Sequence, residues 1–578
     1  MRLLLTLCLV VPALTPMLAL GQDTRISEVA REVVLGNGMR LVMVQRPGQP
    51  NIAAGWVARV GSANERPGIT GISHLFEHMM FKGSDRIGTR DAALDFEIRN
   101  ELDGLRMEMF ALERAYRDQV RLGEGESITD PELVGSEMEV LKERFDEAIA
   151  RQRENMIKDE FDKIYTDEGA SGMNAFTNRD MTVYFIRVPR NKLELWFWME
   201  SERLAQPVFR EFYSERDVVF EERRLRTDST PTGAQDEVFE SLLWRGHPYG
   251  WPVIGWPSDI AAITREQAEA FYDLYYAPAN ITLAIVGDFD EEQAVAWAES
   301  YFGRIPAGLD QAPDVITLAM PQLGELTYRA EVDAPPSATV AWRTVAYTGE
   351  GDAALQVLSS VLSGKTGRLY KRLVLQDQIA TGAGARADSG KYDGTFEAFA
   401  QGKQGVSPDQ LREVLLEEIA LVVSDGITDY ELEKVKNQLA ADKYRRLEDP
   451  FFLLIQLLYY DGLREWRTMD TSYEDVEAVT AADVQAAAER YLVADRVASK
   501  LYQRKAGAEP EDPELAALDP AAQSQVKQML GQLEGRSPDE LRQALTRLEQ
   551  MQAQVPEEAK AAMEYMIKKV NAMLEATP

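Results

Sequence analysis

Short apolar runs separated by turn residues open the folded part of the chain. Residues 33–47, VVLGNGMRLVMVQRP, place apolar runs on both sides of Asn37-Gly38, a pair typical of a tight β-turn. The next run, residues 50–65, holds Pro50 and Trp56 among small and apolar residues and predicts a further strand. We therefore expect a β-hairpin followed by another strand.

A later segment, residues 335–350 (PPSATVAWRTVAYTGE), is similar to the run around Trp56. Pro336 and Trp342 are six residues apart, as Pro50 and Trp56 are. This weak internal repeat predicts two similar α+β halves. Extended without gaps, the repeat aligns residues 74–78 with residues 360–364 (SVLSG), which contain no histidine.

Two charged segments follow a helical period and look like additions to these halves. The first, residues 92–164, repeats apolar residues at helical spacing on both sides of the loop-like stretch 123–132, in which Asp130 before Pro131 is a candidate N-cap. It predicts a long antiparallel helical hairpin. The second follows an acidic linker after Lys505 and predicts about three amphipathic helices over residues 521–576. Both can be solvated appendages or surfaces that contact a partner or substrate.

The N-terminus and the composition limit where the protein works. Residues 1–21 combine one arginine, an apolar run and an Ala19-Leu20-Gly21 ending, which predicts a signal peptide cleaved before Gln22 and a periplasmic protein. A retained membrane anchor is the alternative. The one cysteine, Cys8, lies in this segment, so the mature chain would have no thiol chemistry. The formal net charge of −32 argues against nucleic acids and anionic membranes as partners.

Two of the three histidines stand four residues apart in GISHLFEHMMFKG, residues 71–83. On a helix, His74 and His78 share a face, so both imidazoles can reach one metal ion. A third ligand would complete an open zinc site, and Glu77 can then accept a proton from a water molecule. The alternative is a surface helix with two chance histidines.

The order H-x-x-E-H marks the inverzincins. Residues 68–84, GITGISHLFEHMMFKGS, resemble the active-site helix of the pitrilysin, insulysin and mitochondrial processing peptidase family. The similarity continues through residues 171–185, 247–255 and 275–290, and extends over about Glu32 to Gln503. It implies two homologous α+β domains facing each other around a chamber, the first carrying one zinc ion. We therefore expect a first domain over residues 22–310, with the hairpin 92–164 inserted, a second over 311–505, and a helical extension over 506–578.

The resemblance also implies the remaining site residues. The family takes its third ligand from a helix with two glutamates seven residues apart, which here are Glu215 and Glu222. Glu222 is then the zinc ligand and Glu215 the carboxylate that orients the site. Asn174 and Ala175 match the edge strand to which the substrate backbone adds. His247 is expected in a packed loop rather than on the metal.

One departure concerns the second domain. The family presents an arginine and a tyrosine from that domain to the substrate, seven residues apart. In residues 367–385, GRLYKRLVLQDQIATGAGA, Val374 and Thr381 occupy these positions, and Arg372 and Tyr370 are out of register. Bacterial relatives divide the zinc motif and the Arg/Tyr pair between two chains.

Three functions remain open. The first is a zinc endopeptidase that cleaves peptides or unfolded segments as the zinc-bearing half of a heterodimer, whose homologous partner supplies Arg and Tyr. The second is a self-sufficient zinc peptidase, as a monomer or homodimer. The third is a non-catalytic scaffold subunit.

Overall fold

The fold is known from a computed structural model that describes residues 25–124, 135–505, 512–516, 518, 520–533, 536–552 and 557–576. The expected signal peptide and the N-cap at Asp130 lie outside these residues. The chain forms two compact units. The larger unit extends to Ala330 and resumes over Pro336–Gln503, and the smaller contains Glu331–Pro335 and the chain from Arg504 onward.

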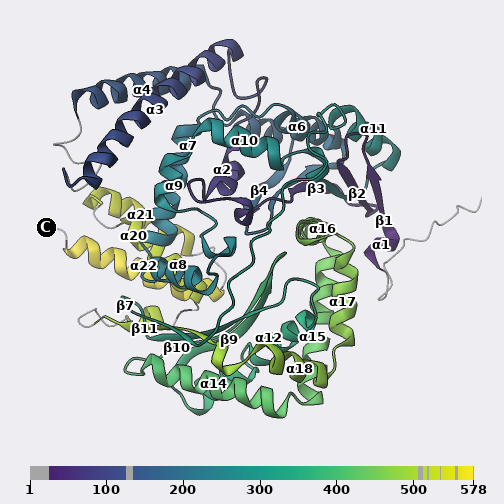
Figure 1. The fold of residues 1–578 in the computed structure, drawn as a ribbon, viewed down its shortest axis with the longest axis vertical. Coiled ribbons are helices and arrows are strands. Elements are labelled where there is room, and N and C mark those ends of the chain that lie inside the picture. Colours follow the sequence, from purple (N-terminus) through teal and green to yellow (C-terminus); the bar gives the residue numbers. More distant parts are fainter. Residues whose placement is uncertain are drawn as a thin grey trace, which may run out of the picture. The chain divides into compact units, whose positions relative to one another are not determined.

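The first sheet of the larger unit has six strands in the order β1-β2-β6-β3-β5-β4 (Figure 1). Strands β1 and β2 form the predicted hairpin, with Gly38 at φ 89° in its turn. β2 pairs with β6 in parallel and the other neighbours are antiparallel. β4 is the last strand in this order and is therefore an edge strand. The strands are β1 (Ala30–Val34), β2 (Arg40–Gln45), β3 (Asn51–Ala58), β4 (Ser171–Thr177), β5 (Thr182–Pro189) and β6 (Ile281–Gly287).

Successive side chains of the inner strands point to opposite faces of this sheet, and both faces are covered by helices. One face, which includes Trp56 and Leu283, packs against α2 (Ile72–Met79), α6 (Leu193–Ala205) and α10 (Arg265–Tyr275). The other, which includes Val57 and Ala284, packs against α16 (Pro450–Leu463). Central strands buried on both sides read as near-continuous apolar runs, as β3 and β6 do.

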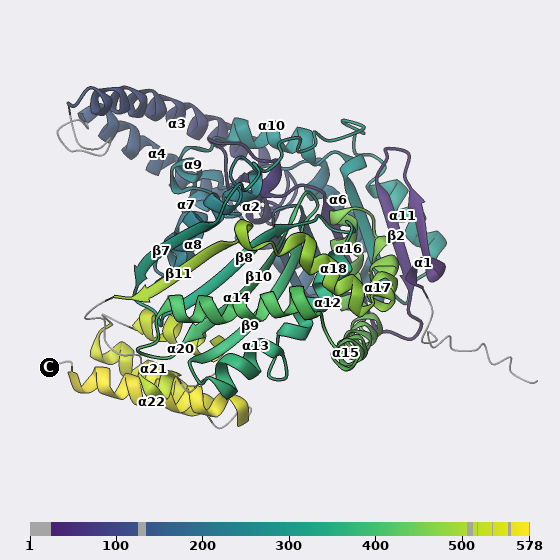
Figure 2. The ribbon, with the colours of Figure 1, turned by 60° about the horizontal axis from the view of Figure 1, so that its bottom comes forward.

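The second sheet has five strands in the order β7-β11-β8-β10-β9. Its strands are β7 (Leu326–Val332), β8 (Ser337–Thr344), β9 (Ala380–Ser389), β10 (Gly394–Gly402) and β11 (Ala498–Arg504). Helices α12 (Asp352–Leu362), α14 (Pro408–Asp425) and α18 (Ala481–Tyr491) cover one of its faces, as Figure 2 shows. The two α+β halves expected from the repeat are therefore present.

The two halves exchange covering helices. Helix α16 belongs to the second half in sequence but packs on the first sheet. Conversely, α8 (Gly233–Leu243) belongs to the first half, and its Phe239 and Leu243 pack with Ala341 and Ala498 of the second sheet. Figure 1 shows α16 beside β1–β3 and α8 beside β7 and β11.

The ungapped alignment of the repeat is wrong by six residues after the strands. Helix α2 starts after Gly71 (φ 91°), and α12 starts after Gly351 (φ 93°). Matching these two glycines aligns His74, Glu77 and His78 with Ala354, Val357 and Leu358, which are buried in the second core. The strand-to-helix loop is shorter in the second half, and the aligned positions still carry no metal-binding side chain.

The predicted helical hairpin is present as α3 (Ala92–Arg121) and α4 (Ser136–Asn155). Thr89 bridges to Met156 at one end and Gly135 N donates to the Tyr116 hydroxyl at the other, so the helices are antiparallel (Figure 1). The predicted end of the second helix is wrong, because α4 stops at Asn155 and α5 (Glu160–Asp167) is a separate helix.

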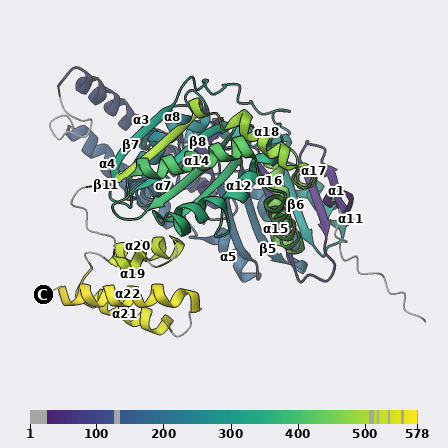
Figure 3. The same cartoon turned by 90° about the horizontal axis from the view of Figure 1, so that it is seen from below.

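The smaller unit contains the predicted C-terminal helices, seen from below in Figure 3. They are α20 (Pro520–Leu533), α21 (Pro538–Gln552) and α22 (Glu557–Ala576), preceded by the short α19 (Pro513–Ala516). Val526, Leu548 and Val570 lie in their shared apolar core.

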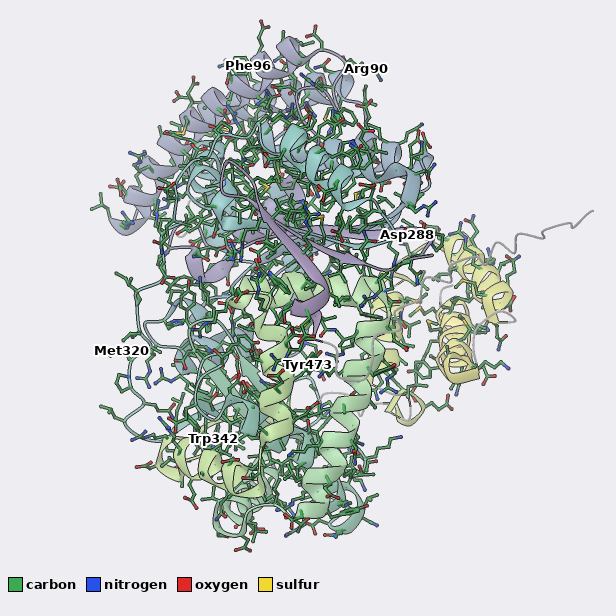
Figure 4. The ribbon with its side chains drawn as sticks, turned by 90° about the vertical axis from the view of Figure 1, so that its right-hand side faces the viewer. Arg90, Phe96, Asp288, Met320, Trp342 and Tyr473 are labelled. Carbon is green, nitrogen blue, oxygen red and sulfur yellow. The ribbon has the colours of Figure 1, made fainter. Side chains whose placement is uncertain are left out.

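A segment without regular structure connects α11 to β7 and contains the expected domain boundary near residue 310. Five of its large apolar side chains, Leu309, Ile316, Leu318, Met320 and Leu323, are exposed, and Met320 lies on the left-hand side in Figure 4. Within the described ranges, no helix is both long and apolar enough to span a bilayer.

The remaining helices are α1 (Ile26–Val29), α7 (Phe212–Arg223), α9 (Pro257–Ala262), α11 (Glu291–Tyr301), α13 (Arg368–Tyr370), α15 (Asp429–Glu448) and α17 (Thr468–Ala478).

Candidate metal centre

Helix α2 carries the histidine pair, and its start is fixed by a buried carboxylate. The two oxygens of Glu65 accept the backbone N–H groups of Gly71 and Ser73, each at 2.8 Å. Gly71 is left-handed, and a Cβ there would lie 2.4 Å from the carbonyl oxygen of Ile254. The first turn of α2 is therefore held from both sides.

The opposite side of α2 anchors the helix in the core through Ile72, Leu75, Phe76 and Met79. This packing leaves His74 and His78 together on one face, with ring centroids 4.9 Å apart. The predicted helix and the shared face of the two imidazoles are both present in the structure.

Helix α7 brings the glutamates to this face, and Figure 1 shows it beside α2. The Oε2 atom of Glu222 lies 3.3 Å from His78 Nε2 and 3.7 Å from His74 Nε2. Tetrahedral zinc with bonds of about 2.0–2.1 Å separates its ligand atoms by roughly 3.3 Å. The donor atoms of His74, His78 and Glu222 lie within 4.8 Å of one another, so this set fits a zinc ion.

Glu215 lies one step behind these ligands, as its seven-residue spacing from Glu222 predicts. Its Oε1 is 3.0 Å from His78 Nδ1, and its Oε2 is 2.5 Å from Lys82 Nζ. The bond to Nδ1 fixes the ring of His78 and leaves Nε2 to face Glu222. Burial opposes ionisation of Glu215, but the bonds from His78 and Lys82 outweigh it and lower the carboxyl pKa.

The charges of the cluster favour a cation between the helices. Burial alone would lower the pKa of His78, but Glu215 and Glu222 raise it to about 9. Burial and the neighbouring His78 lower the pKa of His74 to about 4. The two carboxylates thus attract one positive charge to the point that the imidazoles share.

Glu77 lies on the same helix and lines the same cavity, which has a volume of about 790 Å³. Burial raises the pKa of its carboxyl, against a hydrogen bond with Thr177. A carboxylate with a raised pKa is a stronger base, which suits the role of a proton acceptor.

Strand β4 borders this cavity with its free edge. Asn174 and Ala175 line the cavity and pair with Phe185 and Tyr184 of β5 on the other side of β4. The Asn174 side chain accepts the backbone N–H of Ala175 at 2.9 Å. The cavity side of β4 can therefore take another extended chain.

The third histidine has a different role. His247 is buried, its Nδ1 accepts the N–H of Tyr249, and its ring packs against Trp244 and Tyr249. Its place in a packed loop matches the sequence expectation. Across the described part of the chain, the one group of His, Cys, Asp and Glu side chains that could hold a metal is His74, His78 and Glu222.

Three cavity features were missed from the sequence. Lys82 pairs with Glu215, and Arg226 pairs with Glu222 at 2.6 Å. Each cation stands four residues after a site residue, His78 or Glu222, and this helical spacing could have indicated both. In addition, residues 156, 157 and 159–162, at the end of the inserted hairpin, line the cavity, although the hairpin was expected to be an appendage or a contact surface.

At the two positions of the second half where the resemblance leads us to expect Arg and Tyr, the structure has other side chains. Val374 packs against the second core and Thr381 is exposed at the start of β9. Arg372 forms ion pairs with Asp377, Glu417 and Glu418. Its guanidinium is thus bound by carboxylates of its own half.

Comparisons with known proteins agree with this geometry. The profile described as insulinase (peptidase family M16) matches residues 40–101, and the profile described as peptidase M16 inactive domain matches residues 262–439. The chain is 26% identical over 423 residues to the zinc protease PqqE of Helicobacter pylori, which covers 72% of this chain and 80% of the relative.

Two crystal structures share the fold. A protease from Helicobacter pylori has a TM-score of 0.66 at 22% identity, covering 82% of this chain and 99% of its own. A peptidase M16 inactive domain from Pseudomonas fluorescens has a TM-score of 0.63 at 15% identity, covering 83% and 100%. By its motif, its two sheets and these similarities, the chain resembles the insulinase family of peptidases (M16).

Proposed function

We propose that this chain is a zinc-dependent endopeptidase that hydrolyses peptides or unfolded polypeptide segments. The observation that carries the proposal is the convergence of His74 Nε2, His78 Nε2 and Glu222 Oε2 on one point of the cavity. The names of the relatives as zinc proteases support the choice of metal.

Each residue then has a defined task. His74, His78 and Glu222 would hold the zinc ion, which would supply Lewis-acid activation of the scissile carbonyl and of a water molecule. Glu77 would accept the proton of that water and pass it to the leaving amine. Glu215 holds His78 through Nδ1, and the edge of β4 at Asn174 and Ala175 aligns the substrate backbone.

We further propose that the enzyme is the zinc-bearing half of a heterodimer. The support is indirect: Val374 and Thr381 stand where the family resemblance places Arg and Tyr, and Arg372 is held by three carboxylates. A homologous subunit would supply the missing donors. A self-sufficient enzyme remains the second candidate, because the zinc ligands and Glu77 all lie in one chain.

Export to the periplasm is part of the proposal and rests on residues 1–21 alone. Sequencing the N-terminus of the protein from its native host should yield Gln22 as the first residue. Recovery of Met1 would contradict cleavage and favour the retained anchor.

The enzymatic proposal is tested with the purified chain and an unfolded polypeptide substrate. We expect one zinc ion per chain, hydrolysis that stops with a chelator, and recovery when zinc is returned, with the candidate partner present throughout. A chain that binds no stoichiometric zinc would be a scaffold instead.

A further inference from the structure

The carboxylate of Glu222 is divided between two sets of neighbours. Its Oε2 faces the imidazoles of His74 and His78, at 3.7 and 3.3 Å. Its Oε1 is bound by the guanidinium of Arg226 at 2.6 Å. The oxygen that does not face the metal position is therefore held by a cation.

The backbone that carries Arg226 is anchored independently of this ion pair. Helix α7 ends at Arg223, and residues 224–228 form a π-helical turn in which Ser229 N donates to Arg224 O. Arg223 binds both oxygens of Glu237 at 2.7 Å and the carbonyl of Gly255 at 2.9 Å. Such single π-helical turns often occur at functional sites.

Arg226 differs from the other cations that line the cavity. Lys82 is bound to Glu215 and Glu211, and Arg210 is buried against Asp95 and backbone carbonyls. The side chain of Arg226 is 75% exposed and reaches Glu222 from the cavity side. A solvent-exposed arginine is held in one place here by a single, partly buried carboxylate.

We propose that Arg226 is a positioning residue that holds Glu222 so that it offers one oxygen, Oε2, to the metal. Without the guanidinium, the carboxylate can rotate and present both oxygens or turn away from the histidines. Residues that orient metal ligands typically change metal affinity 10- to 100-fold when removed. This inference rests on the proposed zinc site.

The ordinary alternative is an exposed helix ion pair without influence on the metal. The same turn provides a matched control, because Arg224 pairs with Glu221 at 2.7 Å and both side chains are exposed. If only the charge of Arg226 mattered, its loss would change zinc affinity in the opposite direction. Loss of a positive charge beside the site would strengthen cation binding, so the direction of the change separates positioning from simple charge.

The experiment measures zinc affinity of the full chain by competition with a chromophoric chelator. Arg226→Ala should bind zinc about 10- to 100-fold more weakly than wild type, and Arg226→Lys should recover part of the loss. Arg224→Ala should stay within about threefold of wild type. Cobalt(II) spectra provide the second measurement, because intensity depends on coordination number, and Arg226→Ala should change them whereas Arg224→Ala should not.

Unchanged or tighter zinc binding in Arg226→Ala, with an unaltered cobalt spectrum, would overturn the inference and leave the zinc site standing. A wild-type chain without stoichiometric zinc would overturn both. Circular dichroism in the presence of chelator establishes that each variant folds, and Arg226→Gln replaces the alanine variant if it does not.

Discussion

The two imidazoles of the proposed zinc site are held in different ways. His78 is fixed by the bond of its Nδ1 to Glu215. The Nδ1 of His74 is buried, and the described residues provide no hydrogen-bond partner for it. Its ring is therefore kept in place by packing of α2, and we expect the orientation of His74 to depend on the core beneath it.

Glu77 can be separated experimentally from the ligands beside it. Glu77→Gln keeps the shape of the side chain but cannot accept a proton, so zinc should be retained and hydrolysis should fall by about 10²–10⁴-fold. His74→Ala, His78→Ala and Glu222→Ala should lose the metal. Zinc content and hydrolysis are measured on the same preparations.

The control for these variants is Glu221→Ala, because Glu221 is exposed and pairs with Arg224 away from the histidines. It should keep both zinc and activity. Activity of Glu77→Gln within tenfold of wild type would remove Glu77 from the role of general base.

At the scale of elements, the start of α2 depends on Glu65. Burial, with a smaller contribution from Asp259, raises the pKa of this carboxyl to about 8, although Gly71 and Ser73 donate to it. Asp259 itself accepts N–H groups from Gly68 and Thr70 in the same loop. The proton on Glu65 is therefore bound more tightly in the folded chain than in the unfolded chain.

This difference predicts a pH dependence of stability. Ionisation of Glu65 costs free energy in the folded state. The contribution of Glu65 to the free energy of unfolding should therefore fall as the pH rises from about 5 to 8 and then level off, with a slope of at most about 1.4 kcal/mol per pH unit. Glu65→Gln cannot ionise. The free energy of unfolding of wild type minus that of Glu65→Gln should decrease over this range, measured by urea unfolding with a chelator present. A difference that is constant or rises with pH would contradict the prediction.

At the scale of the whole larger unit, the exchanged helix α16 also carries a buried charge cluster. Asp461 on α16 is fully buried and binds Arg40 of β2, at 2.7 and 2.9 Å, and Arg59 just after β3. The aspartate thus joins a helix of the second half to two segments of the first sheet.

Removing this aspartate should lower the free energy of unfolding more than removing an aspartate from an exposed ion pair. Asp461→Ala leaves two partly buried guanidinium groups without their carboxylate, and the expected loss in free energy of unfolding is about 3–5 kcal/mol. Asp409→Ala breaks the Arg329–Asp409 pair, in which both side chains are 57% exposed, and should cost less than about 1 kcal/mol. Equal losses in urea unfolding would show that the buried cluster does not stabilise the contact of α16.

The proposed heterodimer predicts that the zinc-loaded chain alone hydrolyses unfolded polypeptide slowly. Loss of one donor to the developing oxyanion typically costs about 10²–10³ in rate. A homologous partner that presents Arg and Tyr should restore activity in proportion to the complex formed. Arg372→Ala should have little effect by comparison. Full activity of the lone chain, unaffected by partner, would favour the self-sufficient enzyme.

The sequence determined the features that depend on local geometry. The turn at Asn37-Gly38, the shared face of His74 and His78 and the seven-residue spacing of Glu215 and Glu222 all follow from the fixed repeat of a turn or helix. The resemblance to the family then connected α2 to α7 across 144 positions, from 78 to 222, which the spacing alone could not do.

Only the tertiary structure decided which surfaces meet. The apolar residues of α8 and α16 predict burial but not against which sheet, because hydrophobic contact is non-directional and many partners would satisfy it. For the same reason, the sequence did not place the end of the inserted hairpin in the cavity wall, or Glu65 at the start of α2. Arg226 has a local partner in Glu222, yet in this acidic chain its spacing became meaningful only once the fold had turned Glu222 towards the histidines.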